Sequence, residues 1–325
     1  MPAGERHQVG AGGRRTGRIH GGGPMANQRE IEFTYSLIDR MFRLSLGESA
    51  DFSGAKYDGD FSLTLEQAQR RKHDFVVERI GIRPGRRILD MGCGWGAMLR
   101  RIREEGAEGV GVTLSRKQAE ACRRNGLDAR VQDCRTLTRA GIGGCDGVVS
   151  LGAFEHFCSI REWRAGRQEA VYGDVFRTVY ELLPPGGRFY LQTMVFGPNM
   201  IPYEAIDLDA PRLSDGHVLA LMMKLFPGSW LPYGAEQLQR TAAPYFRVVS
   251  TSSGRLDYIE TIRQWRLRFA RRSLRKLPVY ASLLPRYLFS RDFRLAFASG
   301  VSANTLCFER ELFDHYRIVF EKHVD

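Results

Sequence analysis

Three alternating glycines follow a short apolar run, a pattern typical of a nucleoside-binding site. Residues 88–91 read Ile-Leu-Asp-Met, with the acidic Asp90 near the end, and Gly92, Gly94 and Gly96 come directly after them. Glycine lets the backbone turn tightly and approach a ligand, and the helix expected after Gly96 would point its N-terminus at that ligand. The spacing GxGxG differs from GxGxxG, whose third glycine packs the helix beside a pyrophosphate, so no pyrophosphate is required. For this motif alone, an ordinary tight strand-to-helix turn is the alternative.

Polar side chains stand at the ends of further apolar runs. A second strand is expected over residues 108–115, about one helix length after the glycines, which closes a βαβ unit. Its end offers Thr113, Ser115 and Gln118, whose hydroxyl and amide groups can hydrogen-bond a ribose. A third strand, over residues 129–134, places Asp133 to accept a hydrogen bond from an adenine amino group.

A fourth strand, over residues 147–151, leads into Phe154-Glu155-His156. Ligands bind at the carboxyl edge of open α/β sheets, so these side chains are expected beside the nucleoside site. Glu155 is the candidate for chemistry, because a carboxylate can stabilise positive charge or accept a proton. His156 either takes part directly or orients its neighbours. An ordinary parallel sheet is the alternative reading of the four strand ends.

From about Phe52 onward the chain resembles class I S-adenosylmethionine-dependent methyltransferases, and within them the cyclopropane-fatty-acid synthases and their mycolic acid relatives. The motifs that carry the resemblance are Phe52-Ser53, Leu65-Glu-Gln-Ala-Gln69, Leu89 to Gly96, Gly111-Val-Thr-Leu-Ser115 with Gln118, Phe154-Glu-His156, Leu183-Pro-Pro-Gly-Gly187, Phe226-Pro-Gly228 with Leu231-Pro232, and Asp257-Tyr258 before Trp265.

The resemblance implies S-adenosylmethionine as cofactor and an α/β fold. The fold would be a Rossmann-like sheet of seven mostly parallel strands, with helices on both faces and a helical cap over the acceptor site. The glycines would hold the methionine part of the cofactor, the Thr-Leu-Ser stretch its ribose, and Phe-Ser would close over it. Together with the strand-end reasoning, this predicts as cofactor-binding residues Phe52, Ser53, Asp90, Gly92, Gly94, Gly96, Thr113, Leu114, Ser115, Gln118, Asp133 and Cys134.

Three positions depart from the family pattern. Family members that make cyclopropanes hold a bicarbonate ion as general base with a Cys, a Glu, a His and a Tyr. Here the Cys position is Gly54 and the His position is Gln192, while Glu155 and Tyr258 remain; a further family Cys falls on Asn304. The resemblance therefore gives Glu155, Tyr258 and Gln192 as catalytic candidates, and it leaves the use of bicarbonate open.

The acceptor decides which proton must be removed. A sulfonium methyl group is a strong electrophile, so catalysis needs positioning first and a base second. An alkene acceptor leaves a carbocation that loses a proton or is reduced, whereas an amine or hydroxyl loses only its own proton. The predicted function is transfer of a methyl or methylene group to carbon of an unsaturated fatty acyl chain or lipid. The alternatives are a natural-product type N- or C-methyltransferase, which the altered positions favour, and a non-catalytic module that binds the cofactor.

The 325 residues allow a sheet domain with a substrate-covering subdomain. Residues 1–28, rich in Gly and Arg, are expected to form a disordered basic leader, with Met25 as an alternative start. The methyltransferase domain is expected over residues 29–325. It divides into N-terminal lid helices over 29–70, a cofactor-binding core over 71–197, an acceptor-site insertion over 198–232, and C-terminal strands and basic helices over 233–325.

The predicted insertion is punctuated by prolines and contains the apolar run 218–223, Val-Leu-Ala-Leu-Met-Met. This run could form a wall for a hydrocarbon tail, although a buried core helix has the same composition. Substrate selectivity is expected in this segment.

The formal net charge of +11 is concentrated in residues 260–276, where seven Arg and Lys side chains surround an apolar face with Ile262 and Trp265. A basic amphipathic helix is expected, which could lie on an anionic membrane or dock an acidic carrier protein. A solvated cationic face over packed apolar residues is the alternative. Nucleic acid is not expected as a partner, because no Asn/Asp-Pro-Pro-Tyr/Phe loop follows the fourth strand.

Cysteine use and hydropathy favour a cytoplasmic protein. The six cysteines lack CxxC spacing and no secretory signal precedes them, so we expect reduced thiols and no metal site. No apolar stretch approaches the roughly 20 residues that span a bilayer. Any membrane contact is expected to be peripheral, at the inner surface, through the basic helix.

Overall fold

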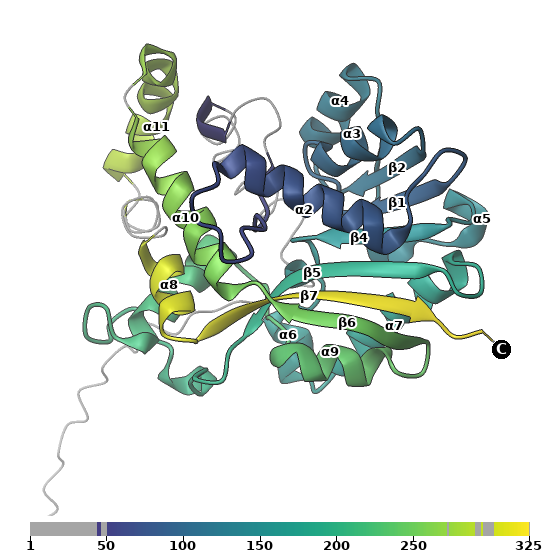
Figure 1. Cartoon of the computed structure of the whole chain (residues 1–325). Coiled ribbons are helices and arrows are strands. Elements are labelled where there is room, and N and C mark those ends of the chain that lie inside the picture. Colours follow the sequence, from purple (N-terminus) through teal and green to yellow (C-terminus); the bar gives the residue numbers. More distant parts are fainter. Residues whose placement is uncertain (1–43, 47–50, 272, 290–293, 295–301, 325) are drawn as a thin grey trace, which may run out of the picture.

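The computed structural model describes residues 44–46, 51–271, 273–289, 294 and 302–324 (Figure 1). The predicted leader, 1–28, lies outside the described residues, as do residues 29–43 and 47–50 of the predicted lid segment over 29–70. Leu46, within the lid segment, is buried in an apolar cluster.

Seven strands form one sheet in the order β3-β2-β1-β4-β5-β7-β6 (Figure 1). The first five strands pair in parallel, and β7 runs antiparallel to β5 and β6. The predicted seven-stranded, mostly parallel sheet is therefore confirmed. The strands are β1 Arg87–Met91, β2 Glu108–Thr113, β3 Asp128–Val131, β4 Gly147–Leu151, β5 Arg188–Phe196, β6 Phe246–Ser253 and β7 Phe313–Lys322.

Helices cover both faces of the sheet because alternate strand residues point to opposite sides. Ile88 packs into one apolar cluster with α2 (Leu65–Ile80), α3 (Ala97–Glu104) and α4 (Arg116–Arg124). Its neighbour Leu89 packs into the other, with α7 (Gln168–Leu182) and α9 (Gly234–Ala242). The shorter helices are α5 (Arg139–Ile142), α6 (Ile160–Arg164), η1 (Cys134–Thr136), η2 (Phe154–His156) and η3 (Tyr203–Ala205).

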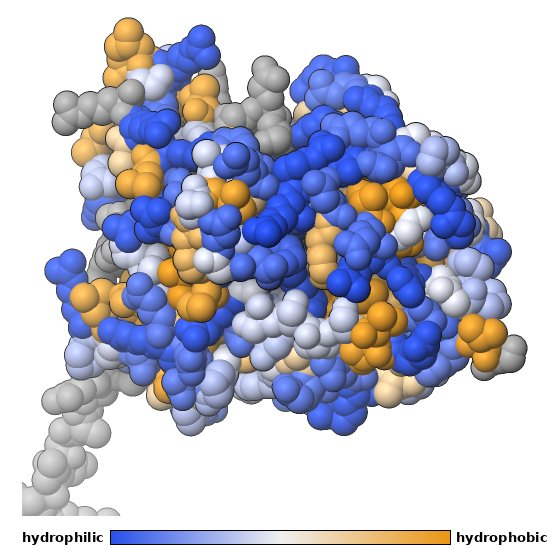
Figure 2. All heavy atoms as spheres, viewed as in Figure 1, coloured by the Kyte–Doolittle hydropathy of each residue, from blue (hydrophilic) through white to orange (hydrophobic). Residues whose placement is uncertain are grey.

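A third apolar cluster forms a cap where β5 ends and β7 begins. Phe196 and Phe313 pair at this edge and pack with α8 (Asp215–Leu225) and α10 (Arg255–Ala270). Beyond α10, the short η4 (Leu274–Lys276) leads into α11 (Leu277–Phe289), which extends from the body at the upper left of Figure 1. In the same view, hydrophobic and hydrophilic residues lie side by side over this part of the surface (Figure 2).

Candidate active site

A cavity at the carboxyl ends of β1, β2 and β4 brings the predicted cofactor residues together. Its described wall contains all of them except Gly96: Phe52, Ser53, Asp90, Gly92, Gly94, Thr113, Leu114, Ser115, Gln118, Asp133 and Cys134. These residues come from four separate chain segments, which the fold brings together at the carboxyl edge of the parallel strands.

The three glycines have different roles in the loop between β1 and α3. All three have positive φ, at 88° for Gly92, 51° for Gly94 and 79° for Gly96, which favours glycine. A Cβ on Gly92 would lie 2.2 Å from the Ala153 Cβ, whereas one on Gly94 would meet nothing within 4 Å. Gly94 therefore leaves open space at the cavity. Gly96 precedes α3 and lies against α4 and Leu127 instead of the cavity.

The end of β2 presents an ordered set of polar groups to the cavity. The Thr113 hydroxyl donates to Gln118 Oε1 at 2.7 Å, and the Ser115 hydroxyl caps α4 by accepting from the Gln118 N–H. Asp133, after β3, accepts from the Arg135 N–H at 2.9 Å. These contacts hold the side chains in place before a ligand binds, as a preformed ligand site requires.

A buried ion network, which the sequence did not reveal, borders the same cavity. Asp51 and His73 line the wall, and Asp51 Oδ2 lies 2.7 Å from Lys72 Nζ and 2.8 Å from His73 Nε2. Lys72 also donates to the Ser53 hydroxyl at 2.7 Å and to Gln69 Oε1 at 2.6 Å. Burial opposes ionisation of Asp51, but Lys72 and His73 hold its pKa well below its ordinary value. The network fixes Ser53 in the wall of the cavity.

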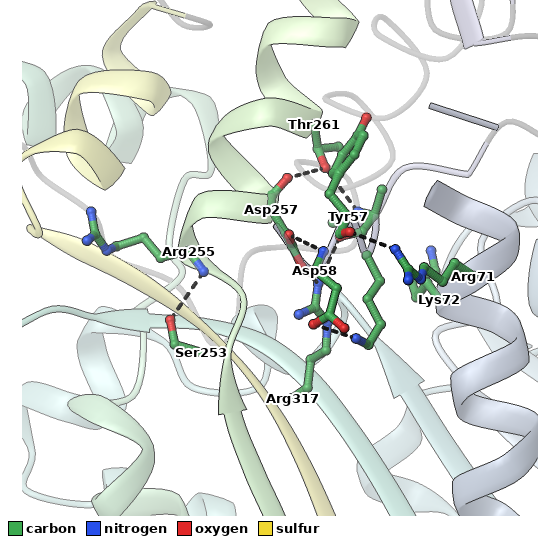
Figure 3. Close-up of polar contacts among 12 residues, drawn as sticks. Tyr57, Asp58, Arg71, Lys72, Ser253, Arg255, Asp257, Thr261 and Arg317 are labelled. Atoms are coloured by element: carbon green, nitrogen blue, oxygen red, sulfur yellow. Dashed lines mark hydrogen bonds and ion pairs between the residues drawn. The ribbon is translucent and has the colours of Figure 1, made fainter. Parts of the chain in front are cut away.

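Residues 51–58 begin in the wall of the first cavity, which Asp51, Phe52 and Ser53 line, and are fastened further along to α10 and β7 (Figure 3). Arg317, on β7, donates to the Ala55 carbonyl at 2.8 Å and pairs with Asp257 of α10 at 2.8 Å. Asp257 also accepts from the Asp58 N–H at 2.9 Å. In addition, the Phe52 ring stacks on Trp265 with centroids 4.6 Å apart.

Asp90 is a buried carboxyl group whose ionised form is unfavourable when no ligand is bound. Burial, together with the nearby charge of Asp51, raises the pKa of Asp90 to about 7. A cationic ligand group in the cavity would favour the ionised form, so this side chain suits a ligand that carries positive charge.

A second, smaller cavity adjoins the first in the cap. It is lined mainly by apolar side chains, among them Leu219, Met222 and Met223 of α8, with Met194 from β5. His156 lines both cavities, and its Nδ1 lies 2.9 Å from the Ser229 hydroxyl oxygen. Burial lowers the pKa of His156 to about 4, so the imidazole at this junction is neutral near pH 7. The apolar run 218–223 thus contributes both to the core and to a cavity wall.

Glu155 is the carboxylate of the second cavity. Its Oε1 accepts from the Met194 N–H at 2.8 Å, and its Oε2 has no hydrogen-bond partner among the described residues. Burial raises the pKa of Glu155 to about 7, although the Met194 N–H opposes that rise. A group with this pKa can hold or release a proton near neutral pH.

The other two catalytic candidates lie behind the cavity walls. Gln192 Nε2 donates to the Gly54 carbonyl at 2.8 Å, and its Oε1 accepts from the Tyr190 hydroxyl at 3.2 Å. The Tyr258 ring packs on His315, with centroids 4.8 Å apart. Neither Gln192 nor Tyr258 is among the described residues that line the two cavities.

His315, a second residue that the sequence did not single out, fills the space beside Gly54. A Cβ on Gly54 would lie 2.5 Å from Tyr258 Cδ2, closer than real Cβ contacts, and 3.0 Å from His315 Cε1, which is tighter than most of them. Burial, with the charges of Arg317 and Lys72, lowers the pKa of His315 well below its ordinary value. The position that carries Cys in the related pattern therefore has no room for a side chain here.

Replacing Gly54 by Ala should lower the free energy of unfolding by about 1–3 kcal/mol, because the new methyl group overpacks the contact with Tyr258 and His315. Urea unfolding measures the change. Gly173→Ala is the matched control. Gly173 lies within α7, and its new Cβ would lie 3.8 Å from Thr241, an ordinary contact distance. Because alanine also favours the helix, no loss of stability is expected. The cost of Gly54→Ala should be smaller in a His315→Ala background. Equal costs in both backgrounds would contradict the packing argument.

Two kinds of feature are absent from the described part of the chain. No group of three or more His, Cys, Asp and Glu side chains there is arranged to hold a metal ion. None of its helices combines the length and apolar character needed to cross a bilayer.

Comparison with known proteins gives a consistent result. Residues 24–282 match the family described as mycolic acid cyclopropane synthetase. The chain is 30% identical over 240 residues to cyclopropane mycolic acid synthase 3 of Mycobacterium tuberculosis, covering 72% of this chain and 79% of that protein. Identity to cyclopropane mycolic acid synthase 1 of the same organism is 31% over 245 residues, with the same two shares covered. The solved structure of the cyclopropane synthase MmaA2 from M. tuberculosis matches with a TM-score of 0.71 and 25% identity, covering 92% of this chain and 99% of that chain.

Proposed function

Because the chain belongs to the mycolic acid cyclopropane synthetase family, we propose that it transfers a methyl or methylene group from S-adenosylmethionine to carbon of an unsaturated fatty acyl chain or lipid. The protein is thus an S-adenosylmethionine-dependent methyltransferase.

The first cavity fits the cofactor. Gly94 leaves space for a ligand against the backbone, and a cationic group of the ligand would stabilise the ionised form of the Asp90 carboxylate. Thr113, Ser115 and Gln118 would hold the ribose, and Asp133 would accept from the adenine. When bound, the cofactor supplies an electrophilic methyl group on a sulfonium. Phe52 and Ser53 would cover the bound molecule and exclude water.

The observation that carries the acceptor is the apolar cavity next to the cofactor site. Its lining is mostly Leu, Met, Phe and Trp side chains, and Glu155 is its carboxylate among the described residues. An alkene needs an apolar environment and one base, and it needs no polar anchor. The cavity measures about 40 Å³, so a long chain requires Met222 and Met223 to move, which flexible thioether side chains permit. Selectivity would then lie in residues 198–232.

Glu155 would act at its Oε2 oxygen. This oxygen is buried without a partner among the described residues, while Oε1 is held by the β5 backbone. The carboxylate is therefore oriented, and it can accept the proton that an alkylated alkene must lose. His156, neutral between the two cavities, would position the acceptor without adding a second positive charge.

Product analysis tests the proposal directly. The enzyme would be incubated with a methyl donor carrying an isotopic label and a total lipid extract, and the products examined by mass spectrometry. We expect label on unsaturated acyl chains and none on saturated chains. Label confined to polar small molecules would overturn the lipid assignment.

One observation favours a small-molecule acceptor as the second candidate. Gln192 Nε2 donates to the Gly54 carbonyl, so these two positions bond to each other instead of supplying the Cys and His groups of the anion cage that the family resemblance would imply. A natural-product type N- or C-methyltransferase has no need of such a cage. Dependence of turnover on added bicarbonate would favour cyclopropane formation, and independence would favour this second candidate.

The pH dependence of turnover should follow Glu155. Because burial raises the pKa of Glu155 to about 7, the active carboxylate is depleted below that pH. We expect kcat to rise about tenfold per pH unit up to pH 7 and to level off above it. Asp90 also has a pKa of about 7, so kcat is measured at saturating cofactor. The rise of kcat with pH should persist in Asp90→Asn and disappear in Glu155→Gln. If kcat of Glu155→Gln still rose with pH, another group would be responsible for the pH dependence.

A further inference from the structure

The predicted basic helix over 260–276 is not one continuous helix in the structure. α10 ends at Ala270, with Ile262 and Trp265 buried against the cap. Lys276 also turns inward and donates to three backbone carbonyls near the end of α10. Two of the arginines are paired with acidic side chains, Arg263 with Glu260 and Arg268 with Glu66. Most of the exposed large apolar side chains of this region lie further along the chain.

η4 and α11 expose large apolar side chains to solvent. Leu274 is 83% exposed, Leu284 53%, Leu288 57% and Phe289 88%. On α11 itself, Leu277, Tyr280, Leu284 and Leu288 follow helical spacing and so share one side, while Val279 and Leu283 turn inward. Singly exposed apolar residues are common, but a clustered row of them on one helix marks a contact surface.

The charge around this row has one sign. Residues 261–291 contain nine Arg and Lys and no Asp or Glu. Of these, Arg266, Arg271 and Arg275 are exposed. A second copy of the chain docked through α11 would bring these cations together, so self-association through this surface is opposed by charge repulsion.

We infer that η4 and α11 form a docking surface for an anionic lipid bilayer. We call the set Leu274, Leu277, Tyr280, Leu284, Leu288 and Phe289 the α11 surface. Exposed Leu and Phe insert into the boundary between headgroups and acyl chains, Tyr is favoured at that depth, and arginines beside them pair with anionic headgroups. This contact is independent of methyl transfer, because it depends on none of the residues in the two cavities.

Flotation with lipid vesicles tests the inference on the full chain. We expect binding to vesicles of phosphatidylglycerol and phosphatidylcholine, and weak binding to phosphatidylcholine alone. Leu284→Ser/Leu288→Ser should weaken binding at least tenfold, because the favourable transfer of each leucine side chain from water into the bilayer is lost. Arg271→Gln/Arg275→Gln should weaken binding to the anionic vesicles roughly fivefold per charge and reduce its salt dependence.

Matched controls carry the same substitutions elsewhere. Leu256→Ser removes a leucine that is 59% exposed at the start of α10, and Arg83→Gln/Arg124→Gln removes two exposed arginines of the cofactor domain. Neither control should change binding. Circular dichroism checks that every variant is folded. Equal vesicle binding by Leu284→Ser/Leu288→Ser and by Leu256→Ser would overturn the inference. It would also be overturned if the wild-type protein sedimented as a dimer and Leu284→Ser/Leu288→Ser sedimented as a monomer. Capture of an acidic soluble protein without vesicle binding would also overturn it.

Discussion

Replacing Glu155 by Gln should lower turnover by a factor of about 10² to 10⁴, the range that a positioned general base contributes. The amide has the same shape and cannot accept a proton at Oε2. Its position is set by the Met194 N–H, which can still donate to an amide oxygen. Cofactor affinity, measured by calorimetry with the demethylated product, should change little, because Glu155 is not among the described residues of the first cavity.

A matched control for this variant is Glu204→Gln. Glu204 is an exposed carboxylate of η3, within residues 198–232, a segment that supplies part of the wall of the second cavity. Its replacement should leave turnover unchanged. If Glu155→Gln kept wild-type turnover, Glu155 would have no part in the chemistry; if it lost cofactor binding as well, its role would be structural.

The largest effect on stability is expected from Lys72→Met. This change should lower the free energy of unfolding by about 3–5 kcal/mol, because it leaves the Asp51 carboxylate buried without its closest cation. The pKa of Asp51 is depressed in the folded protein, so the stabilisation is complete above its ordinary pKa of about 4 and declines in acid. The difference between wild type and variant should therefore shrink as the pH falls below about 4.

Arg70→Met provides the comparison for Lys72→Met on the same helix. Arg70 forms ion pairs with Asp74 and Glu104 in which all side chains are about half exposed, so its loss should cost less than about 1 kcal/mol. The double variant Asp51→Asn/Lys72→Met should recover part of the loss, because no unpaired charge remains. Urea unfolding of the four proteins decides the matter. Equal losses for Lys72→Met and Arg70→Met would show that burial of the pair has no energetic effect.

The sheet could be predicted from local patterns. β1, β2 and β4 are short runs made mostly of apolar residues and Gly, and the predicted fourth strand coincides with β4. The third strand, predicted over 129–134, is wrong at its end. β3 ends at Val131, and residues 134–136 form η1 because Asp133 caps them. A short polar cap of this kind competes with strand formation and is invisible to hydropathy alone.

The contacts around the site could not be predicted in the same way. Asp51 and Lys72 are far apart in sequence, and a lysine on a helix is far more often solvated than buried. Likewise, nothing in the sequence near His315 connects it with Gly54, since β7 reaches that corner only through its pairing with β5. Local motifs identify residues that sit at strand ends, whereas partners supplied by distant segments require the completed fold.

The fastening of residues 51–58 by Arg317 has a consequence for how the protein is made. β7 is the last of the seven strands in chain order, yet it inserts between β5 and β6 and holds the Ala55 carbonyl. During synthesis on the ribosome, residues 51–58 therefore lack this hydrogen bond until β7 has emerged. A chain that stops before β7 already contains the glycine turn and the first six strands in chain order, but its residues 51–58 have no contact with Arg317.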